Sequence, residues 1–167
     1  MAEIISLNVS IEKGTRKAPV PEAMLVAGHG VAGDGHAGGW HRQISLLAAE
    51  SIARMRGRGL DVGPGDFAEN VTTSGIDLVS LPVGTCLRLG EALVRITQIG
   101  KRCHSRCEIY RQAGDCVMPR EGVFAVVLEG AAVAAGDPIG IVAGHGGADE
   151  GNIAAGPPPA ASGEAPR

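Results

Sequence analysis

Short apolar runs separated by glycine and proline turns make up most of the chain, and this pattern predicts β structure. Residues 4–9 and 23–27 are the first two runs and are rich in β-forming side chains. Residues 86–89 and 92–99 form a longer pair joined by a Gly-Glu dipeptide. Two β-rich runs around a two-residue loop that begins with glycine predict a hairpin with a primed turn.

Three more runs, residues 71–73, 122–128 and 138–142, extend the β pattern. One helix is predicted from Ser45 to about Arg56, where apolar residues recur at helical spacing after a serine that can cap the first turn. Pairs of short strands around glycine turns, with one good helix, are typical of a barrel. The predicted fold class is therefore mainly β, a closed or partly open β-barrel with one or two short helices.

Composition predicts one domain followed by a tail. The 167 residues include 26 glycines and 10 prolines, too many for a helical bundle, and the 44% hydrophobic content is enough for a core. Towards the C-terminus the sequence changes to Gly, Ala, Pro and acidic residues, a composition typical of disorder. We predict a domain at residues 1–143 and a disordered tail at residues 144–167.

Charge and hydropathy argue against two classes of protein. The net charge of −3 and the scarcity of aromatic residues argue against a nucleic-acid-binding protein. No segment reaches the roughly 20 apolar residues of a membrane span, and residues 1–10 lack the features of a signal peptide. We expect a cytoplasmic protein whose cysteines are thiols or ligands rather than disulfides.

Candidate chemistry concentrates between residues 99 and 124. Three of the four cysteines lie there: Cys103, Cys107 and Cys116. Five basic residues lie there as well: Lys101, Arg102, Arg106, Arg111 and Arg120. Positive neighbours stabilise a thiolate, which is the form of cysteine that attacks, carries sulfur or binds metal. This stretch therefore predicts a reactive thiol site.

The cysteines also admit an interpretation as metal ligands. Together with His104 they offer three or four zinc ligands, although the second of the paired hooks usual at structural zinc is incomplete. Cys86 lies in a predicted strand, and we expect it to be a small core residue.

A glycine-rich loop at residues 28–41 carries a second set of candidates. Residues 28–33 fit the pattern G-x-G-x-x-G, but the next predicted helix begins too late for the turn-to-helix junction that binds a dinucleotide. Asp34, His36 and His41 in this loop are candidate metal ligands, phosphate contacts or solvent-facing polar residues.

Several segments follow one another in an order that we recognise from a known family. They are Gly-Asp-Gly-His-Ala-Gly at 33–38, Trp-His-Arg-Gln at 40–43, Pro-Gly-Asp-Phe-Ala-Glu-Asn-Val-Thr-Thr at 64–73, Leu-Pro-Val-Gly-Thr at 81–85, Leu-Arg-Leu-Gly-Glu at 87–91, Gly-Lys-Arg-Cys-His-Ser-Arg-Cys at 100–107, Gly-Asp-Cys-Val-Met-Pro-Arg-Glu-Gly-Val-Phe at 114–124 and Gly-Asp-Pro-Ile at 136–139. With these segments the chain resembles the MOSC domain, named for the C-terminal domain of molybdenum cofactor sulfurases, and more closely its short stand-alone bacterial members.

The resemblance implies a barrel like that of the pyruvate-kinase barrel domain and a role in handling sulfur for molybdenum or a related metal–sulfur centre. It also implies that Cys103 is the sulfur carrier, preceded here by Arg102 where many relatives have proline. Larger relatives add a pyridoxal-phosphate desulfurase domain, for which this chain has no room. Its Schiff-base lysine would have to be Lys13, Lys17 or Lys101, which weakens the case for pyridoxal phosphate.

Residues and resemblance together give a hypothesis. Cys103 accepts a persulfide from a donor such as a cysteine desulfurase and presents the sulfur to a molybdopterin-type molybdenum cofactor, and Cys107 or Cys116 resolves the persulfide. The acceptor partner is a molybdoenzyme or a cofactor-biosynthesis protein. Eight residues are expected to hold the cofactor: Asp34, His36, His41, Asn70, Thr72, Lys101, Arg102 and Arg120.

Two alternatives stay open. In the first, Cys103, His104, Cys107 and Cys116 bind a metal or cofactor without transfer chemistry. In the second, the protein is an accessory in the reduction of N-hydroxylated compounds. If it is an enzyme, it is of the sulfurtransferase type.

Overall fold

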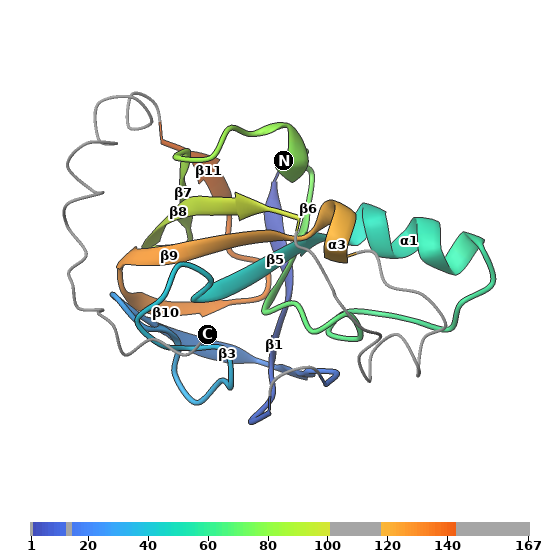
Figure 1. Cartoon of the computed structure of the whole chain (residues 1–167), viewed down its shortest axis with the longest axis horizontal. Helices are drawn as coiled ribbons and strands as arrows, with labels where there is room; N and C mark the ends of the chain where they lie inside the picture. The colour runs from blue at the N-terminus through green and yellow to red at the C-terminus, as the bar shows by residue number, and fades with distance from the viewer. Residues whose placement is uncertain (1, 13–14, 101–117, 143–167) are drawn as a thin grey trace.

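The computed structural model describes residues 2–12, 15–100 and 118–142, which form a mainly β molecule (Figure 1). The helical elements are α1 (Ala49–Gly57), the 3-10 turn η1 (Leu78–Ser80) and α3 (Met118–Glu121). The strands are β1 (Glu3–Val9), β2 (Ala18–Val20), β3 (Glu22–Val26), β4 (Gly30–Val31), β5 (Ile44–Ala48), β6 (Val71–Ser74), β7 (Cys86–Leu89), β8 (Ala92–Ile99), β9 (Val123–Glu129), β10 (Ala131–Ala134) and β11 (Ile139–Ile141). The predicted tail lies outside the described residues.

Two sheets make up the barrel. The larger has the order β11-β7-β8-β9-β5-β6-β1-β2, and the smaller has the order β10-β3-β4. Only β5 and β6 pair in parallel among these strands, which suits two strands joined through a helix. Hydrogen bonds from Ile4 N–H to Asp137 O (2.9 Å) and from Ile139 N–H to Ala2 O (3.0 Å) connect β11, at one end of the larger sheet, to β1 near the other end. The barrel is partly open, and the predicted fold class is confirmed.

The predicted hairpin is present at β7 and β8. Leu89 pairs with Ala92 across a two-residue turn, and Gly90 has a φ of 59°. Glu91 is not among the residues with positive φ, so the turn has the pattern of type II′, in which glycine occupies the first central position. Cys86, at the start of this hairpin, is fully buried, as predicted for a core residue.

The predicted helix from Ser45 to about Arg56 is wrong in its first turn. Residues 44–48 form the strand β5 between β6 and β9, and α1 begins only at Ala49. Leu46 packs into the main core cluster while its neighbour Leu47 packs into a second cluster under α1. A strand buried on both faces reads as a continuous apolar run, which helical spacing fits equally well.

Three short strands, β2, β4 and β10, were not predicted because their sequences, Ala-Pro-Val, Gly-Val and Ala-Ala-Val-Ala, contain few β-forming side chains. β4 lies inside the G-x-G-x-x-G pattern, and turn residues follow it where a dinucleotide site requires a helix. No helix within the described ranges is long and apolar enough to cross a membrane.

Candidate functional site

A buried ion pair fixes the glycine-rich loop to the barrel. Lys17 Nζ lies 2.8 Å from Asp34 Oδ1, and neither side chain is exposed to solvent. Oδ1 also accepts a hydrogen bond from the backbone N–H of Ser10 (3.0 Å), and Oδ2 accepts one from the backbone N–H of His36 (3.0 Å). The carboxylate of Asp34 therefore binds two backbone N–H groups, of Ser10 and His36, and the ammonium group of Lys17.

The pKa of Asp34 is lowered from its ordinary value. Burial acts in the opposite direction, but the hydrogen bond and positive charge of Lys17, together with the N–H groups of Ser10 and His36, outweigh it. Asp34 is therefore an anion whose charge Lys17 neutralises inside the protein. Removing either partner would leave an uncompensated buried charge.

The ammonium group of Lys17 is fully engaged. Besides Asp34 it contacts Ser10 Oγ at 3.0 Å and His36 Nδ1 at 3.3 Å, so its three N–H donors face three acceptors. A Schiff base with pyridoxal phosphate needs an accessible amine, and Lys17 does not provide one. The other two candidate lysines, Lys13 and Lys101, lie outside the described residues.

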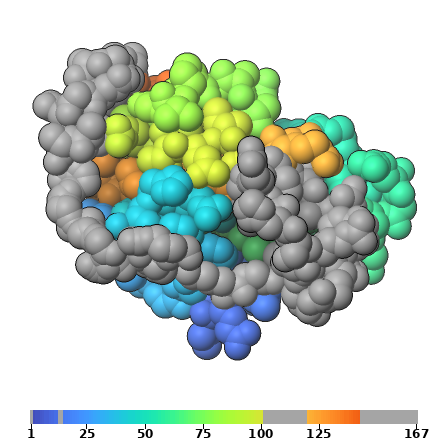
Figure 2. All heavy atoms as spheres, viewed as in Figure 1, coloured from blue at the N-terminus to red at the C-terminus, as the bar shows by residue number. Residues whose placement is uncertain are grey.

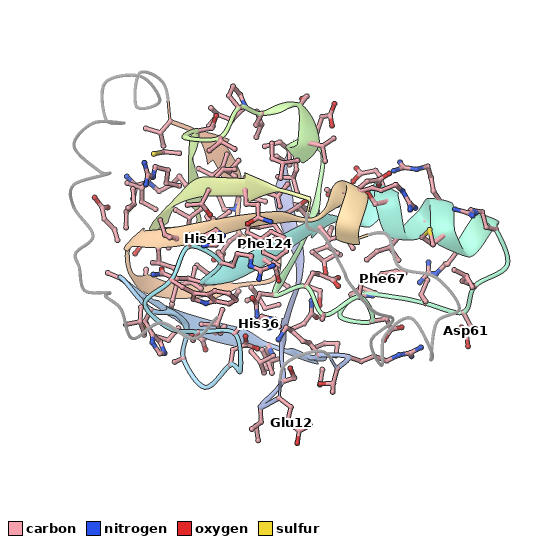
Figure 3. All side chains as sticks on the ribbon, in the orientation of Figure 1. Glu12, His36, His41, Asp61, Phe67 and Phe124 are labelled. Carbon is pink, nitrogen blue, oxygen red and sulfur yellow. The ribbon has the colours of Figure 1, made fainter. Side chains whose placement is uncertain are left out.

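After His36 the loop places Arg42 against two aromatic rings. Trp40 is held in place because its Nε1–H donates to His36 O (2.9 Å). The Cζ atom of Arg42 lies 4.7 Å from the centroid of the Trp40 ring and 5.4 Å from that of Phe124, which comes from β9. Figure 3 shows His41 and Phe124 on the same part of the barrel, with His36 below them. The loop thus places a guanidinium in contact with two aromatic rings.

His41 connects this loop to the end of β8. Its Nε2 lies 2.7 Å from Gln98 Oε1, its carbonyl accepts a hydrogen bond from Thr97 Oγ1, and Gln98 Nε2 donates to Gly100 O at 2.8 Å. Figure 2 shows the light-blue atoms of the loop at the surface, directly below the yellow-green atoms of β8. The exposed imidazole of His41 is therefore placed one hydrogen-bonded residue away from Gly100.

Gly100 and Gly122 close the base of the cysteine-containing stretch. The N–H of Gly100 donates to Gly122 O at 2.6 Å, where β8 ends and β9 begins. Arg120, on α3, is exposed. The remaining predicted residues of this stretch lie outside the described residues: Lys101, Arg102, Cys103, His104, Cys107 and Cys116. In the part of the chain that the structure does describe, no group of three or more His, Cys, Asp or Glu side chains is placed to hold a metal ion.

Asn70 and Thr72, also predicted to hold a cofactor, lie in a buried polar network. Asn70 Oδ1 accepts the N–H of Ser45 (3.0 Å), and Asn70 Nδ2 donates to Asn8 O (3.2 Å). Thr72 Oγ1 donates to Glu69 Oε2 at 2.6 Å. Both residues are at most 1% exposed, so neither side chain lies at the surface. Their contact with a cofactor stays a prediction.

Glu69 lies at the centre of this network. Its Oε2 accepts hydrogen bonds from Thr72 and from the N–H of Gly65 (2.9 Å), while Oε1 has no hydrogen-bond partner. Burial raises the pKa of Glu69 to about 7, although these hydrogen bonds act to lower it. The carbonyl oxygen of Gly65 in turn accepts a hydrogen bond from the backbone N–H of Lys17 at 2.8 Å. The buried network is therefore hydrogen-bonded to the residue that forms the ion pair with Asp34.

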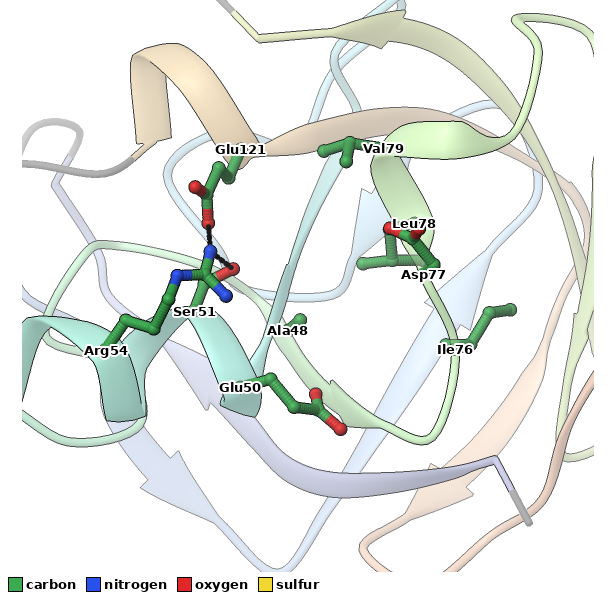
Figure 4. Close-up of a pocket in the computed structure, with 9 residues that line it drawn as sticks. All are labelled: Ala48, Glu50, Ser51, Arg54, Ile76, Asp77, Leu78, Val79 and Glu121. Atoms are coloured by element: carbon green, nitrogen blue, oxygen red, sulfur yellow. Dashed lines mark hydrogen bonds and ion pairs between the residues drawn. The ribbon is translucent and has the colours of Figure 1, made fainter.

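A groove of about 440 Å³ lies elsewhere, between α1 and η1 (Figure 4). Its apolar lining residues are Ala48, Ile76, Leu78 and Val79. Its rim carries Glu50, Asp77, Glu121 and Arg54, and Arg54 is ion-paired with Glu121. None of the residues predicted from the sequence lines this groove.

The molecule is thus a partly open barrel. Lys17 and Asp34 fix its glycine-rich loop, which is connected through His41 and Gln98 to Gly100, where the cysteine-containing stretch begins. The family model of the MOSC domain matches residues 33–140, and the chain belongs to the MOSC domain family. This family is associated with proteins of molybdenum cofactor metabolism. No curated protein matches the sequence.

Solved structures share the fold. The chain is similar to the YuaD protein from Bacillus subtilis, with 20% identity, a TM-score of 0.68 and coverage of 84% of this chain and 96% of that one. It is similar to YiiM from Geobacillus stearothermophilus, with 20% identity, a TM-score of 0.66 and coverage of 85% and 75%. YiiM from Escherichia coli gives 24% identity, a TM-score of 0.58 and coverage of 83% and 69%.

Sequence reasoning missed two parts of the site. Lys17 entered only as a possible Schiff-base residue, whereas it is the counter-ion of Asp34. Arg42 was matched as part of a motif but given no role, although it adjoins the only tryptophan of the chain. An arginine two residues after a lone tryptophan was a usable signal, because Arg stacks on aromatic faces.

Proposed function

We propose that this protein carries sulfane sulfur as a persulfide on Cys103 and delivers it to a molybdopterin-type molybdenum cofactor. Membership of the MOSC family supports the general role. The single observation that supports the placement is the hydrogen bond between Gly100 and Gly122, because it fixes the point from which the cysteine-containing stretch departs.

Covalent geometry links that point to Cys103. Cys103 follows Gly100 by three residues in the sequence, and successive Cα atoms across trans peptides are 3.8 Å apart, so its backbone is tethered within about 11 Å of Gly100. Gln98 and His41 form a hydrogen-bonded chain to Gly100. The tether therefore supports a sulfur atom that works beside the glycine loop.

The first chemical step exchanges one sulfur–sulfur bond for another. The thiolate of Cys103 attacks the terminal sulfur of a persulfide on the donor protein, such as a cysteine desulfurase. A sulfur–sulfur bond forms on Cys103, the bond in the donor breaks, and the donor leaves as a thiolate. Lys101 and Arg102 are proposed to stabilise the attacking thiolate.

Delivery as sulfide requires two electrons, which a second thiol supplies. The thiolate of Cys107 or Cys116 attacks Sγ of Cys103, a disulfide forms, and the terminal sulfur leaves as HS⁻. A dithiol reductant then returns both cysteines to thiols and is itself oxidised. Lys101, Arg102 and Arg120 are proposed to hold the anionic groups of the cofactor that receives the sulfur.

The test is transfer of radiolabelled sulfur from a cysteine desulfurase supplied with labelled cysteine, under anaerobic conditions. Wild type should retain a label that dithiothreitol removes, and Cys103→Ser should lose it. Cys86→Ala is the matched control, because Cys86 is buried in the barrel and should not take part. Label that persists on Cys103→Ser would show that another residue is the carrier.

A further inference from the structure

The guanidinium of Arg42 has a donor that no described residue uses. Its Nε atom is buried and has no hydrogen-bond partner. No carboxylate of the described residues forms an ion pair with Arg42, whereas Arg16, Arg54 and Arg88 each pair with one. Its fixed neighbours are instead the rings of Trp40 and Phe124.

Both rings contact the guanidinium of Arg42, while its Nε–H donor has no hydrogen-bond partner within the described ranges. A ring stacked on the plane of an arginine interacts with its face, while all five N–H donors point outward within that plane. The donors of a stacked arginine are therefore held in a fixed direction, without the loss of side-chain freedom that a flexible arginine undergoes on binding. A rigid planar fork of this kind matches two oxygens of a phosphate.

A chain of contacts holds the fork in place. Asp34, neutralised by Lys17, binds the backbone of His36, and the carbonyl of His36 binds Trp40. Phe124, the second ring that contacts Arg42, belongs to β9 and is only 3% exposed. Two rings from separate parts of the fold thus orient the guanidinium of Arg42. An arginine that served only solubility would not need such fixed neighbours.

We propose that Arg42 binds a tetrahedral oxyanion of the phosphate-monoester type. This inference rests on the proposed function, since it assigns Arg42 to the terminal phosphate of the pterin cofactor. His41, with its exposed ring beside Trp40 (centroids 5.9 Å apart), lies on the same loop and leads through Gln98 to Gly100. A phosphate at Arg42 would therefore anchor the cofactor next to the tether of Cys103.

The probes are inorganic phosphate and molybdate, titrated into the full chain. Trp40 is the only tryptophan, so its fluorescence reports on the ring that touches Arg42. Phosphate should change this fluorescence saturably. Isothermal titration calorimetry should show that Arg42→Gln weakens phosphate binding by at least about tenfold, because a charge-assisted hydrogen bond is lost. Arg42→Lys should weaken it less, since the charge stays and the fork does not.

Arg95→Gln is the matched control. Arg95 also has a buried Nε without a partner and forms no ion pair among the described residues, but it has no aromatic stack there. It should bind phosphate like the wild type. Equal loss in both variants would reduce the effect to general charge and overturn the proposal. Thermal unfolding of each variant checks that the fold is intact.

Two further outcomes separate this proposal from the proposed function. If wild type does not bind phosphate, or binds molybdate but not phosphate, the assignment of Arg42 is wrong while sulfur labelling of Cys103 is unaffected. If Arg42→Gln loses phosphate binding and still accepts labelled sulfur on Cys103 from the donor protein, both stand. If Cys103 takes no label but phosphate binds through Arg42, the anion site stands and the sulfur-carrier function fails.

Discussion

Replacing Glu69 by glutamine should remove a large pH dependence of stability. The carboxyl is fully buried, and its folded-state pKa is raised from 4.5 to about 7. The folded protein therefore keeps this proton at pH values where the unfolded chain has lost it. The contribution of this bound proton to the unfolding free energy is fully present below pH 4.5 and is lost as the pH rises through 7.

The size of the effect follows from the raised pKa. Each pKa unit corresponds to 1.36 kcal/mol, so a rise from 4.5 to about 7 amounts to roughly 3 kcal/mol lost between these values. The direction is unusual, because most carboxyl groups stabilise a fold as pH rises. Its cause is the burial of the carboxyl, whose Oε1 has no hydrogen bond from a described residue to offset the loss of solvation.

The assay is urea unfolding at several pH values from 4.5 to 8, with wild type and Glu69→Gln compared at each one. The difference in unfolding free energy between them should change by about 3 kcal/mol across that range, in favour of the glutamine variant at the alkaline end. Glu91→Gln, on the exposed β7–β8 turn, should follow the wild type. Equal slopes for wild type and Glu69→Gln would refute the reasoning.

Three further outcomes are expected. Lys17→Met should lower the unfolding free energy by about 3–5 kcal/mol, measured by urea denaturation, because the charge of Asp34 is left buried and unpaired; a change below 1 kcal/mol would contradict the pinning role. Gly65→Ala should destabilise the protein more than Gly33→Ala: both have positive φ, but only the new Cβ at position 65 meets a backbone oxygen, at 2.2 Å. Maleimide should modify Cys86 only after unfolding, as mass spectrometry can check, since this thiol is fully buried.

The sequence predicted strands well where turn chemistry marked their ends. The β7–β8 hairpin was recognisable because glycine is required at the first position of its turn, where φ is 59°. It predicted β5 as helix because periodicity cannot separate a strand buried on both faces from a helix. Pairing with β6 and β9, which decides the matter, is a tertiary effect that no local pattern carries.

The site was only partly accessible to the same reasoning. Asp34, His36 and His41 could be placed on one loop because they stand close together in the sequence. The pairing of Lys17 with Asp34 joins residues 17 positions apart and depends on how the loop folds back. Glu69 entered only as part of the family segment at residues 64–73, since no sequence pattern shows that a carboxyl will be buried.

The hydrogen bond between Gly100 and Gly122 has a consequence for how such proteins diverge. Because it closes the stretch at its root, the length and composition of residues 101–121 can change while the register of β8 and β9 is kept. The entropy of closing a loop grows only slowly with the number of residues, so insertions there cost the barrel little. The cysteine-containing stretch can therefore change its sequence, and with it its specificity, while the barrel keeps its structure.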